Sequence, residues 1–119
     1  MSTKIEINLE HLLSDTVMKY LFERHDPESK FKRKQVISVA NFSKFTSMSN
    51  KDAFDLLQKT IEGWLGQTLL YEEIKYEHQV DQRIISTYSS NFNSLTEQGK
   101  MKVSFSSELH SQLSKKLNI

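Results

Sequence analysis

Apolar residues recur every three or four positions between Leu9 and Arg24, a spacing that places them on one side of an α-helix. The stripe consists of Leu9, Leu12, Leu13, Val17, Tyr20, Leu21 and Phe22. Asp26-Pro27 ends this predicted helix, because proline disfavours helical geometry in the preceding residue and cannot donate to the turn before it. The polar, basic sequence ESKFKRK then predicts a connector over residues 28–34.

The next positions predict a short strand, a short helix and a turn. Residues 36–39 (VISV) have the density of β-branched side chains that is typical of a strand. Ser38 can cap a short helix that runs to Phe45, in which Val39, Phe42 and Phe45 share one face. Residues 46–50 (TSMSN) then favour a turn.

A long helix is predicted to start at this turn. Ser49 is followed three residues later by Asp52, a variant of the capping box in which the acidic residue also suits the helix dipole. The predicted buried stripe is Ala53, Phe54, Leu57, Ile61, Trp64 and Leu65, and Lys51, Asp55, Gln58, Lys59 and Glu62 lie opposite. After Gly66 the pattern around residues 69–76 favours a strand, with continuation of the helix to Tyr71 as the alternative.

Two further segments predict a β-hairpin. RIISTYSSNF over residues 83–92 is rich in β-branched and aromatic residues, and KMKVSF over residues 100–105 alternates apolar and polar side chains. The connection over residues 93–99 ends in Gly99, which we expect to take the positive φ that closes the hairpin. Ser106 or Ser107 then caps a final helix that carries Leu109, Leu113 and Leu117, with Lys115 and Lys116 in its last turn.

This order of elements predicts an α+β winged helix, in which a helix-turn-helix is followed by a β-hairpin wing. With 119 residues and 37% hydrophobic residues, the chain is expected to form one such domain over residues 1–119. In a winged helix the second helix of the motif can enter the major groove of DNA while the hairpin reaches the phosphates beside it.

Composition limits the possible functions. Sixteen Lys plus Arg against fifteen Asp plus Glu give a net charge of +1, so any binding to nucleic acid must use local patches. The absence of cysteine excludes disulfides, thiolate catalysis and cysteine-ligated metal sites. No apolar run has the length of a signal peptide or a membrane span, so we expect a cytoplasmic protein with no membrane partner.

Enzymatic chemistry is not expected either. The four histidines, His11, His25, His78 and His110, share no metal-ligand spacing, and no metal or other cofactor is predicted. Neither a Gly-x-Ser-x-Gly elbow nor a phosphate-binding loop is present among the many serines. We therefore expect a binding module without a small-molecule substrate.

Residues 37–73 and 82–117 resemble the N-terminal winged-helix domain of the replication initiators of iteron-bearing plasmids. The most specific part is GKMKVSFSSEL over residues 99–109, which is similar to the family pattern G-x-(M/V)-x-(V/L)-x-F-S-x-E-L. The resemblance implies a domain that contacts the phosphate backbone at repeated origin sequences, forms the homodimer interface, and is followed in the intact initiator by a second winged helix.

Cations and amides on the predicted connector, long helix and wing are the candidates for contact with double-stranded DNA. The candidate residues are Lys30, Lys32, Arg33, Lys34, Asn50, Lys51, Gln58, Lys59, Lys100 and Lys102. Asp52 and Asp55 at the start of the long helix would repel phosphates, which argues against strong base reading by that helix. Two alternatives remain open: a free-standing winged-helix transcription regulator, and a dimerisation domain without strong DNA binding.

Overall fold

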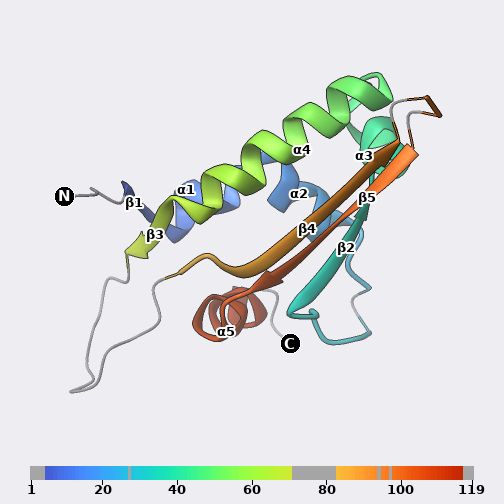
Figure 1. The fold of residues 1–119 in the computed structure, drawn as a ribbon. Helices are drawn as coiled ribbons and strands as arrows, with labels where there is room; N and C mark the ends of the chain where they lie inside the picture. The colour runs from blue at the N-terminus through green and yellow to red at the C-terminus, as the bar shows by residue number, and fades with distance from the viewer. Residues whose placement is uncertain (1–4, 27, 71–82, 94, 97, 117–119) are drawn as a thin grey trace, which may run out of the picture.

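A three-stranded antiparallel sheet forms the centre of the molecule, and helices cover one of its faces (Figure 1). The computed structural model describes residues 5–26, 28–70, 83–93, 95–96 and 98–116. The sheet consists of β2 (Lys34–Ser38), β4 (Ile85–Asn93) and β5 (Gln98–Phe105), in the spatial order β2-β5-β4. A separate parallel pair joins β1 (Ile5–Asn8) to β3 (Gln67–Leu70).

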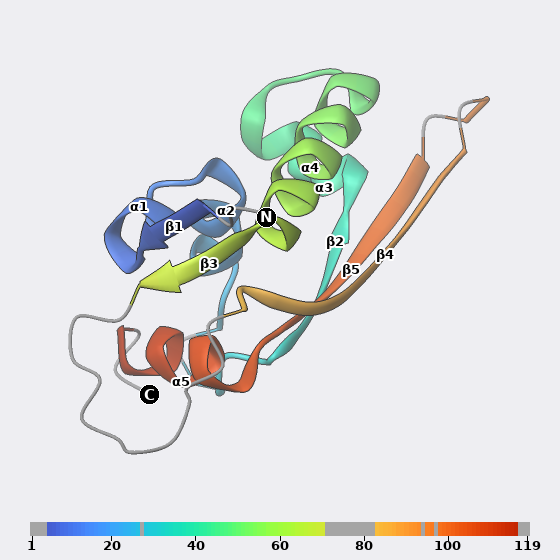
Figure 2. The ribbon, with the colours of Figure 1, turned by 60° about the vertical axis from the view of Figure 1, so that its left-hand side comes forward.

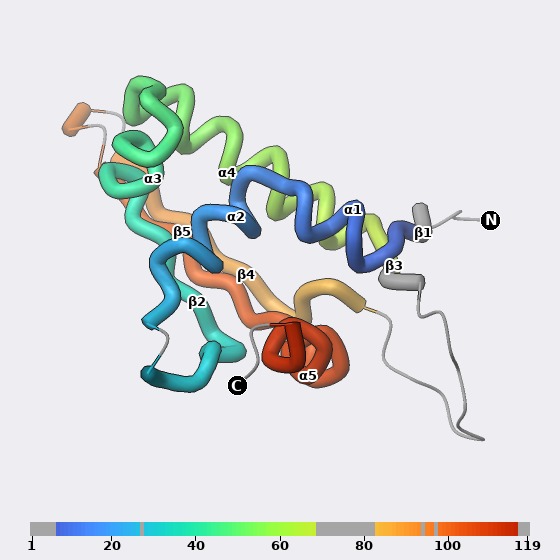
Figure 3. Tube along the Cα trace, turned by 180° about the vertical axis from the view of Figure 1, so that it is seen from behind, coloured from blue at the N-terminus to red at the C-terminus, as the bar shows by residue number. Residues whose placement is uncertain are grey.

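The described residues form five helices, which confirms the α+β class. They are α1 (Leu9–Leu13), α2 (Thr16–Glu23), α3 (Val39–Thr46), α4 (Asn50–Leu65) and α5 (Ser107–Lys116). Figure 2 shows α3 and α4 along one side of the sheet, with α5 at the end where β5 finishes. In Figure 3, from behind, α1 and α2 run beside α4. None of the helices described is long and apolar enough to cross a membrane.

Alternation along the strands determines which face of the sheet the helices cover. On β5, Met101, Val103 and Phe105 are buried, and the residues between them face the other way. The register continues this division across the sheet, because Met101 lies opposite buried Ile37 and Val103 lies opposite half-buried Tyr88. The prediction of a hairpin with an inward apolar face is therefore confirmed.

Local capping explains the helix-turn-helix. The Ser38 hydroxyl accepts a hydrogen bond from the Asn41 amide at 3.4 Å, and the Ser49 hydroxyl accepts one from the Asp52 amide at 3.1 Å. Between α3 and α4, Ser47 has a left-handed backbone conformation with φ 60°, which turns the chain sharply. The expected starts of α3 and α4 are both confirmed, since each depends on residues adjacent in sequence.

Replacing Ser49 by alanine should lower the free energy of unfolding by about 1 kcal/mol, because the first turn of α4 loses an acceptor for one amide. Ser49→Asp keeps a side-chain acceptor at the same position, so it should be close to neutral. Urea denaturation of the two variants compares them directly. Equal stability of both variants would mean that the Ser49 hydroxyl does not cap α4 in solution.

The single helix predicted from Leu9 to Arg24 is wrong: the segment forms α1 and α2 with a break at Ser14 and Asp15. The cause is a contact distant in sequence. Asp15 has an extended backbone, and its carboxylate accepts a hydrogen bond from the Trp64 indole nitrogen at 3.0 Å. Periodicity alone predicted one helix, because Leu13 and Val17 keep a helical spacing of four residues across the break.

Three smaller expectations also need correction. Phe31 in the polar connector is buried, whereas Leu65 in the predicted apolar stripe of α4 is exposed. Gly99 does not close the hairpin with a positive φ, since none of the described glycines has one. It lies inside β5 opposite Phe92, where a side chain would collide with the neighbouring backbone.

The segment after α4 is a strand from Gln67 to Leu70, so the alternative of a helix reaching Tyr71 does not hold within the described part. The remainder of the strand predicted over residues 69–76 lies outside the described residues, as does Leu117 at the end of the last helix. The Ser106 hydroxyl accepts a hydrogen bond from the Leu109 amide at 3.2 Å, which confirms it as the cap of α5.

Candidate nucleic-acid interface

The face of the sheet that the helices leave uncovered is polar, and we call it the outer sheet face. It consists of Lys34, Val36 and Ser38 on β2, Thr87, Ser89, Asn91 and Asn93 on β4, and Gln98, Lys100, Lys102 and Ser104 on β5. None of the three strands contains Asp or Glu. The outer sheet face therefore presents ammonium, hydroxyl and amide groups without an opposing carboxylate of its own.

Strand register brings three lysines together on this face. Lys100 and Lys102 alternate with buried residues of β5, which separates them by about 7 Å along the strand. On the neighbouring strand, Lys34 lies opposite Ser104, which is two residues beyond Lys102 on the same side of β5. All three side chains are exposed, and none forms an ion pair with a described residue. A polyanion could approach these ammonium groups directly.

Hydrogen-bonding side chains surround the lysines. Ser38 lies opposite Lys100 on one side, and Asn91 lies opposite it on the other. Ser89 flanks Lys102 on β4 in the same way. These residues and the start of α3 line a concavity of ≈ 940 Å³ that extends to the hairpin tip. Serine hydroxyls and asparagine amides are groups that commonly donate to phosphate oxygens in protein–DNA complexes.

The basic connector leads into the outer sheet face at Lys34. Lys30 and Lys32 are exposed, so their ammonium groups are free to meet solvent or an anion. Arg33 has a different role, because its guanidinium Nε donates to the Phe105 carbonyl oxygen at 2.7 Å and holds the connector against the end of β5. The connector therefore contributes lysines to the neighbourhood of this face, while Arg33 fixes their position.

The exposed face of α4 has the opposite electrostatic character. Lys51 and Lys59 are exposed there, but they share the surface with exposed Asp52, Asp55 and Glu62. Three carboxylates against two ammonium groups leave a net charge of −1 on these five side chains, which disfavours insertion between phosphate backbones.

Two further candidates, Gln58 and Asn50, also belong to α4. The Gln58 amide donates to the Glu62 carboxylate at 3.1 Å, so this amide already has a partner. Asn50 is the first residue of α4 and is half-buried, while the cap itself is Ser49. The Gln58 amide is therefore less available to an anion than the sheet lysines are.

Aromatic stacking and a hydrogen bond tie the hairpin to α4. Phe54 on α4 stacks on Phe92 of β4, with ring centroids 4.3 Å apart and planes within 9°. The Tyr88 hydroxyl donates to the Glu62 carboxylate at 3.3 Å. Desolvation and the adjacent Glu62 carboxylate both raise the pKa of the Tyr88 phenol, so it keeps its proton and remains a donor. These contacts join α4 to the inner side of the hairpin.

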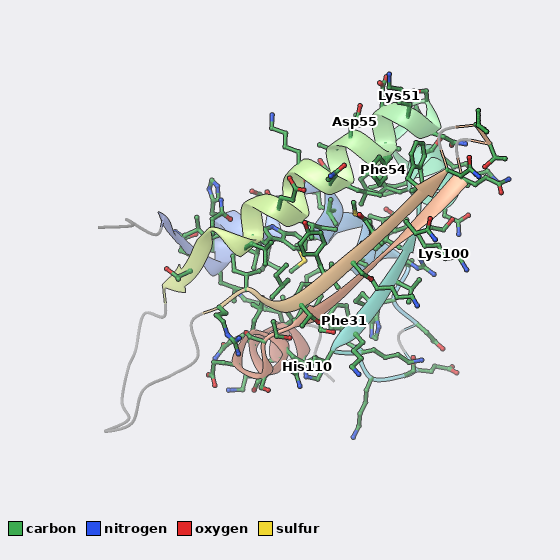
Figure 4. The ribbon with its side chains drawn as sticks, viewed as in Figure 1. Phe31, Lys51, Phe54, Asp55, Lys100 and His110 are labelled. Carbon is green, nitrogen blue, oxygen red and sulfur yellow. The ribbon has the colours of Figure 1, made fainter. Side chains whose placement is uncertain are left out.

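The candidate residues thus fall into two groups on different sides of the molecule. Figure 4 shows Lys51 and Asp55 on α4, and Lys100 on the other side of the hairpin. Lys34, Lys100 and Lys102 share the outer sheet face, although they are far apart in sequence. Sequence reasoning missed Ser38, Ser89 and Asn91 as part of this group. Alternation with Lys100 and Lys102 was the available signal, but the register that aligns the strands was not predictable.

The described residues contain no cluster of His, Asp or Glu that could hold a metal ion. Comparison with known proteins finds no matching family model, curated protein or solved structure. What this site does therefore has to follow from its residues and their geometry.

Proposed function

We propose that this chain is a winged-helix module of a plasmid replication initiator, which binds duplex DNA at origin repeats mainly through the phosphate backbone and also dimerises. The order α2-β2-α3-α4-β3-β4-β5 supports the winged helix, because a helix-turn-helix is followed, after β3, by a hairpin whose second strand pairs with β2. The sharp turn at Ser47 between two capped helices fits the same interpretation.

One observation carries the proposal of DNA binding: three lysines and several hydroxyl and amide donors share a sheet face that has no carboxylate. Lysine ammonium groups neutralise phosphates and release condensed counterions, which supplies most of the sequence-independent affinity for DNA. The mixed charge on α4 favours backbone contact over base reading by this domain.

The assignment to replication initiators rests on the resemblance over residues 99–109. In this segment Gly99 permits close strand pairing, Phe105 is buried and Ser106 caps α5. These positions explain why the sequence GKMKVSFSSEL suits the end of a wing and the start of a helix. The link to origin repeats comes from the family resemblance alone, so a binding experiment has to test it.

Dimerisation is the second candidate function, and the edge of the sheet favours it. The order β2-β5-β4 leaves one edge of β2 without a partner strand among the described residues. Val36 on this strand is 47% exposed, so it offers an apolar side chain beside the open edge. Antiparallel pairing of two β2 edges would satisfy their backbone groups and join two outer sheet faces into one wider basic face.

DNA binding should depend strongly on salt. Three lysine–phosphate contacts predict a slope of about −2.7 in a plot of log affinity against log salt, which is an affinity loss of about 40-fold between about 50 and 200 mM. Fluorescence anisotropy with a duplex carrying repeated origin sequences measures it. If the chain bound no duplex with a salt-dependent affinity, the result would contradict the proposal.

Sedimentation of the same chain tests dimerisation, and a strict monomer at high concentration would exclude it.

A further inference from the structure

We infer that duplex DNA lies across the outer sheet face, over Lys34, Lys102 and Lys100, and that the exposed face of α4 does not touch it. The inference rests on the proposed DNA binding and names the surface that performs it. It reverses the arrangement expected from the winged-helix order alone, in which the second helix of the motif enters the major groove with the wing beside it.

The first reason is the direction in which the hairpin lysines project. Phe92 and Tyr88 on the inner side of the hairpin contact α4, through the stack on Phe54 and the hydrogen bond to Glu62. Lys100 lies on the opposite side of the same hairpin, as Figure 4 shows. The sheet therefore stands between the wing lysines and the exposed face of α4. One short stretch of DNA backbone cannot contact both the wing lysines and the exposed face of α4.

The second reason is the balance of charge on the two surfaces. Lys34, Lys100 and Lys102 stand on strands that contain no acidic residue, so no carboxylate of the sheet reduces their combined positive potential. On α4, Asp55 and Asp52 lie within one turn of Lys51, and the summed charge of the exposed face is negative. A phosphate backbone is therefore attracted by the outer sheet face and repelled by the exposed face of α4.

The third reason concerns the form of the nucleic acid. Binding of single strands without sequence preference uses exposed aromatic side chains on which the bases stack. The aromatic residues of β4 and β5, namely Tyr88, Phe92 and Phe105, all lie on the inner side of the sheet. The outer sheet face can therefore hold a charged backbone but offers no stacking platform, which fits a duplex whose bases remain paired.

Two double variants with the same change in charge separate the two surfaces. Lys100→Ala with Lys102→Ala removes two ammonium groups from the outer sheet face, and Lys51→Ala with Lys59→Ala removes two from α4. Both pairs are exposed, so neither variant should unfold the protein, and thermal melting tests this. Anisotropy with one labelled duplex at several salt concentrations gives the affinity and its salt slope for each.

For the sheet variant we expect an affinity about 60-fold lower at about 0.1 M salt and a slope shallower by about 1.8, since two phosphate contacts are lost. The α4 variant should keep the slope of the unmodified chain, because charges that do not contact DNA are largely screened at this ionic strength. Single-stranded DNA of the same length should bind more weakly than the duplex.

The outcomes also separate this inference from the proposal beneath it. A larger loss for the α4 variant, or equal losses for both variants, would overturn the inference while DNA binding itself stands. Absence of binding by the unmodified chain would remove the proposed function. If poly-glutamate displaced the labelled duplex as effectively as unlabelled DNA of equal charge did, the inference would be overturned in favour of an acidic polypeptide partner. Preference for the single strand would overturn the choice of a duplex.

Discussion

Replacing Phe31 by alanine is expected to lower the free energy of unfolding by about 3–5 kcal/mol, the range observed for large aromatic side chains removed from a protein core. Phe31 is only 2% exposed although it stands in a polar connector. Its ring lies within 5.7 Å of the Phe22 ring centroid and 5.6 Å of that of His25. It also stacks near Phe105 and His110, at 6.2 and 6.4 Å. The cavity left by alanine would face four rings that cannot all move inward.

Urea denaturation measures this loss, and Leu95→Ala supplies the control. Leu95 is 94% exposed near the hairpin tip, so its truncation should change the free energy of unfolding by less than about 0.5 kcal/mol. If Phe31→Ala cost no more than Leu95→Ala, the connector would not be anchored to the core as described. The expected loss would also loosen the lysines on either side of Phe31, because the anchored ring fixes the path of the connector.

Phe31 illustrates the kind of information that the sequence did not contain. A single aromatic residue between Lys30 and Lys32 has no apolar neighbour at helical or strand spacing, so nothing local marks it as buried. Its burial depends on α2, β5 and α5, which meet only in the folded chain. The hydrogen bond between the Phe31 carbonyl oxygen and His110 Nε2, at 2.6 Å, joins segments 79 positions apart.

The elements that were predictable depend on local interactions. Ser38, Ser49 and Ser106 each mark a helix start, because the capping hydroxyl and the amide it accepts from are three residues apart. The division of α1 from α2 was not predictable, since the Asp15 carboxylate contacts Trp64 far along the chain. Local signals thus predicted which elements form, and contacts distant in sequence decided where they break.

The candidate interface shows the same division. Alternation predicted that Lys100 and Lys102 share a side of their strand, and the structure places both on the outer sheet face. That Lys34 joins them depends on the pairing of β2 with β5, which no residue pattern specifies. The acidic character of the exposed face of α4 was predictable from the sequence, because Asp52 and Asp55 fall on the exposed side of a helix whose start was correctly predicted.

Replacing Gly99 by alanine is expected to destabilise the protein by about 3 kcal/mol, the upper part of the range for overpacking substitutions. A Cβ atom at this position would collide with the Asn91 carbonyl oxygen and would lie 2.8 Å from the Phe92 Cα. Both obstacles are backbone atoms of β4, so no side-chain rotation relieves the contact. The two strands must separate, which also displaces Phe92 from its stack on Phe54 and shifts the adjacent Lys100.

Gly63→Ala is the matched control, since it makes the same chemical change inside α4. No atom lies within 4 Å of a Cβ built there, and alanine favours a helix more than glycine does. This variant should therefore gain about 0.5–1 kcal/mol in stability. Thermal and urea unfolding of both variants give opposite signs if strand proximity is what requires glycine at position 99. Stability of Gly99→Ala equal to that of the unmodified chain would show that β4 and β5 do not approach this closely, and the register that places Ser89 and Asn91 beside Lys102 and Lys100 would then fail with it.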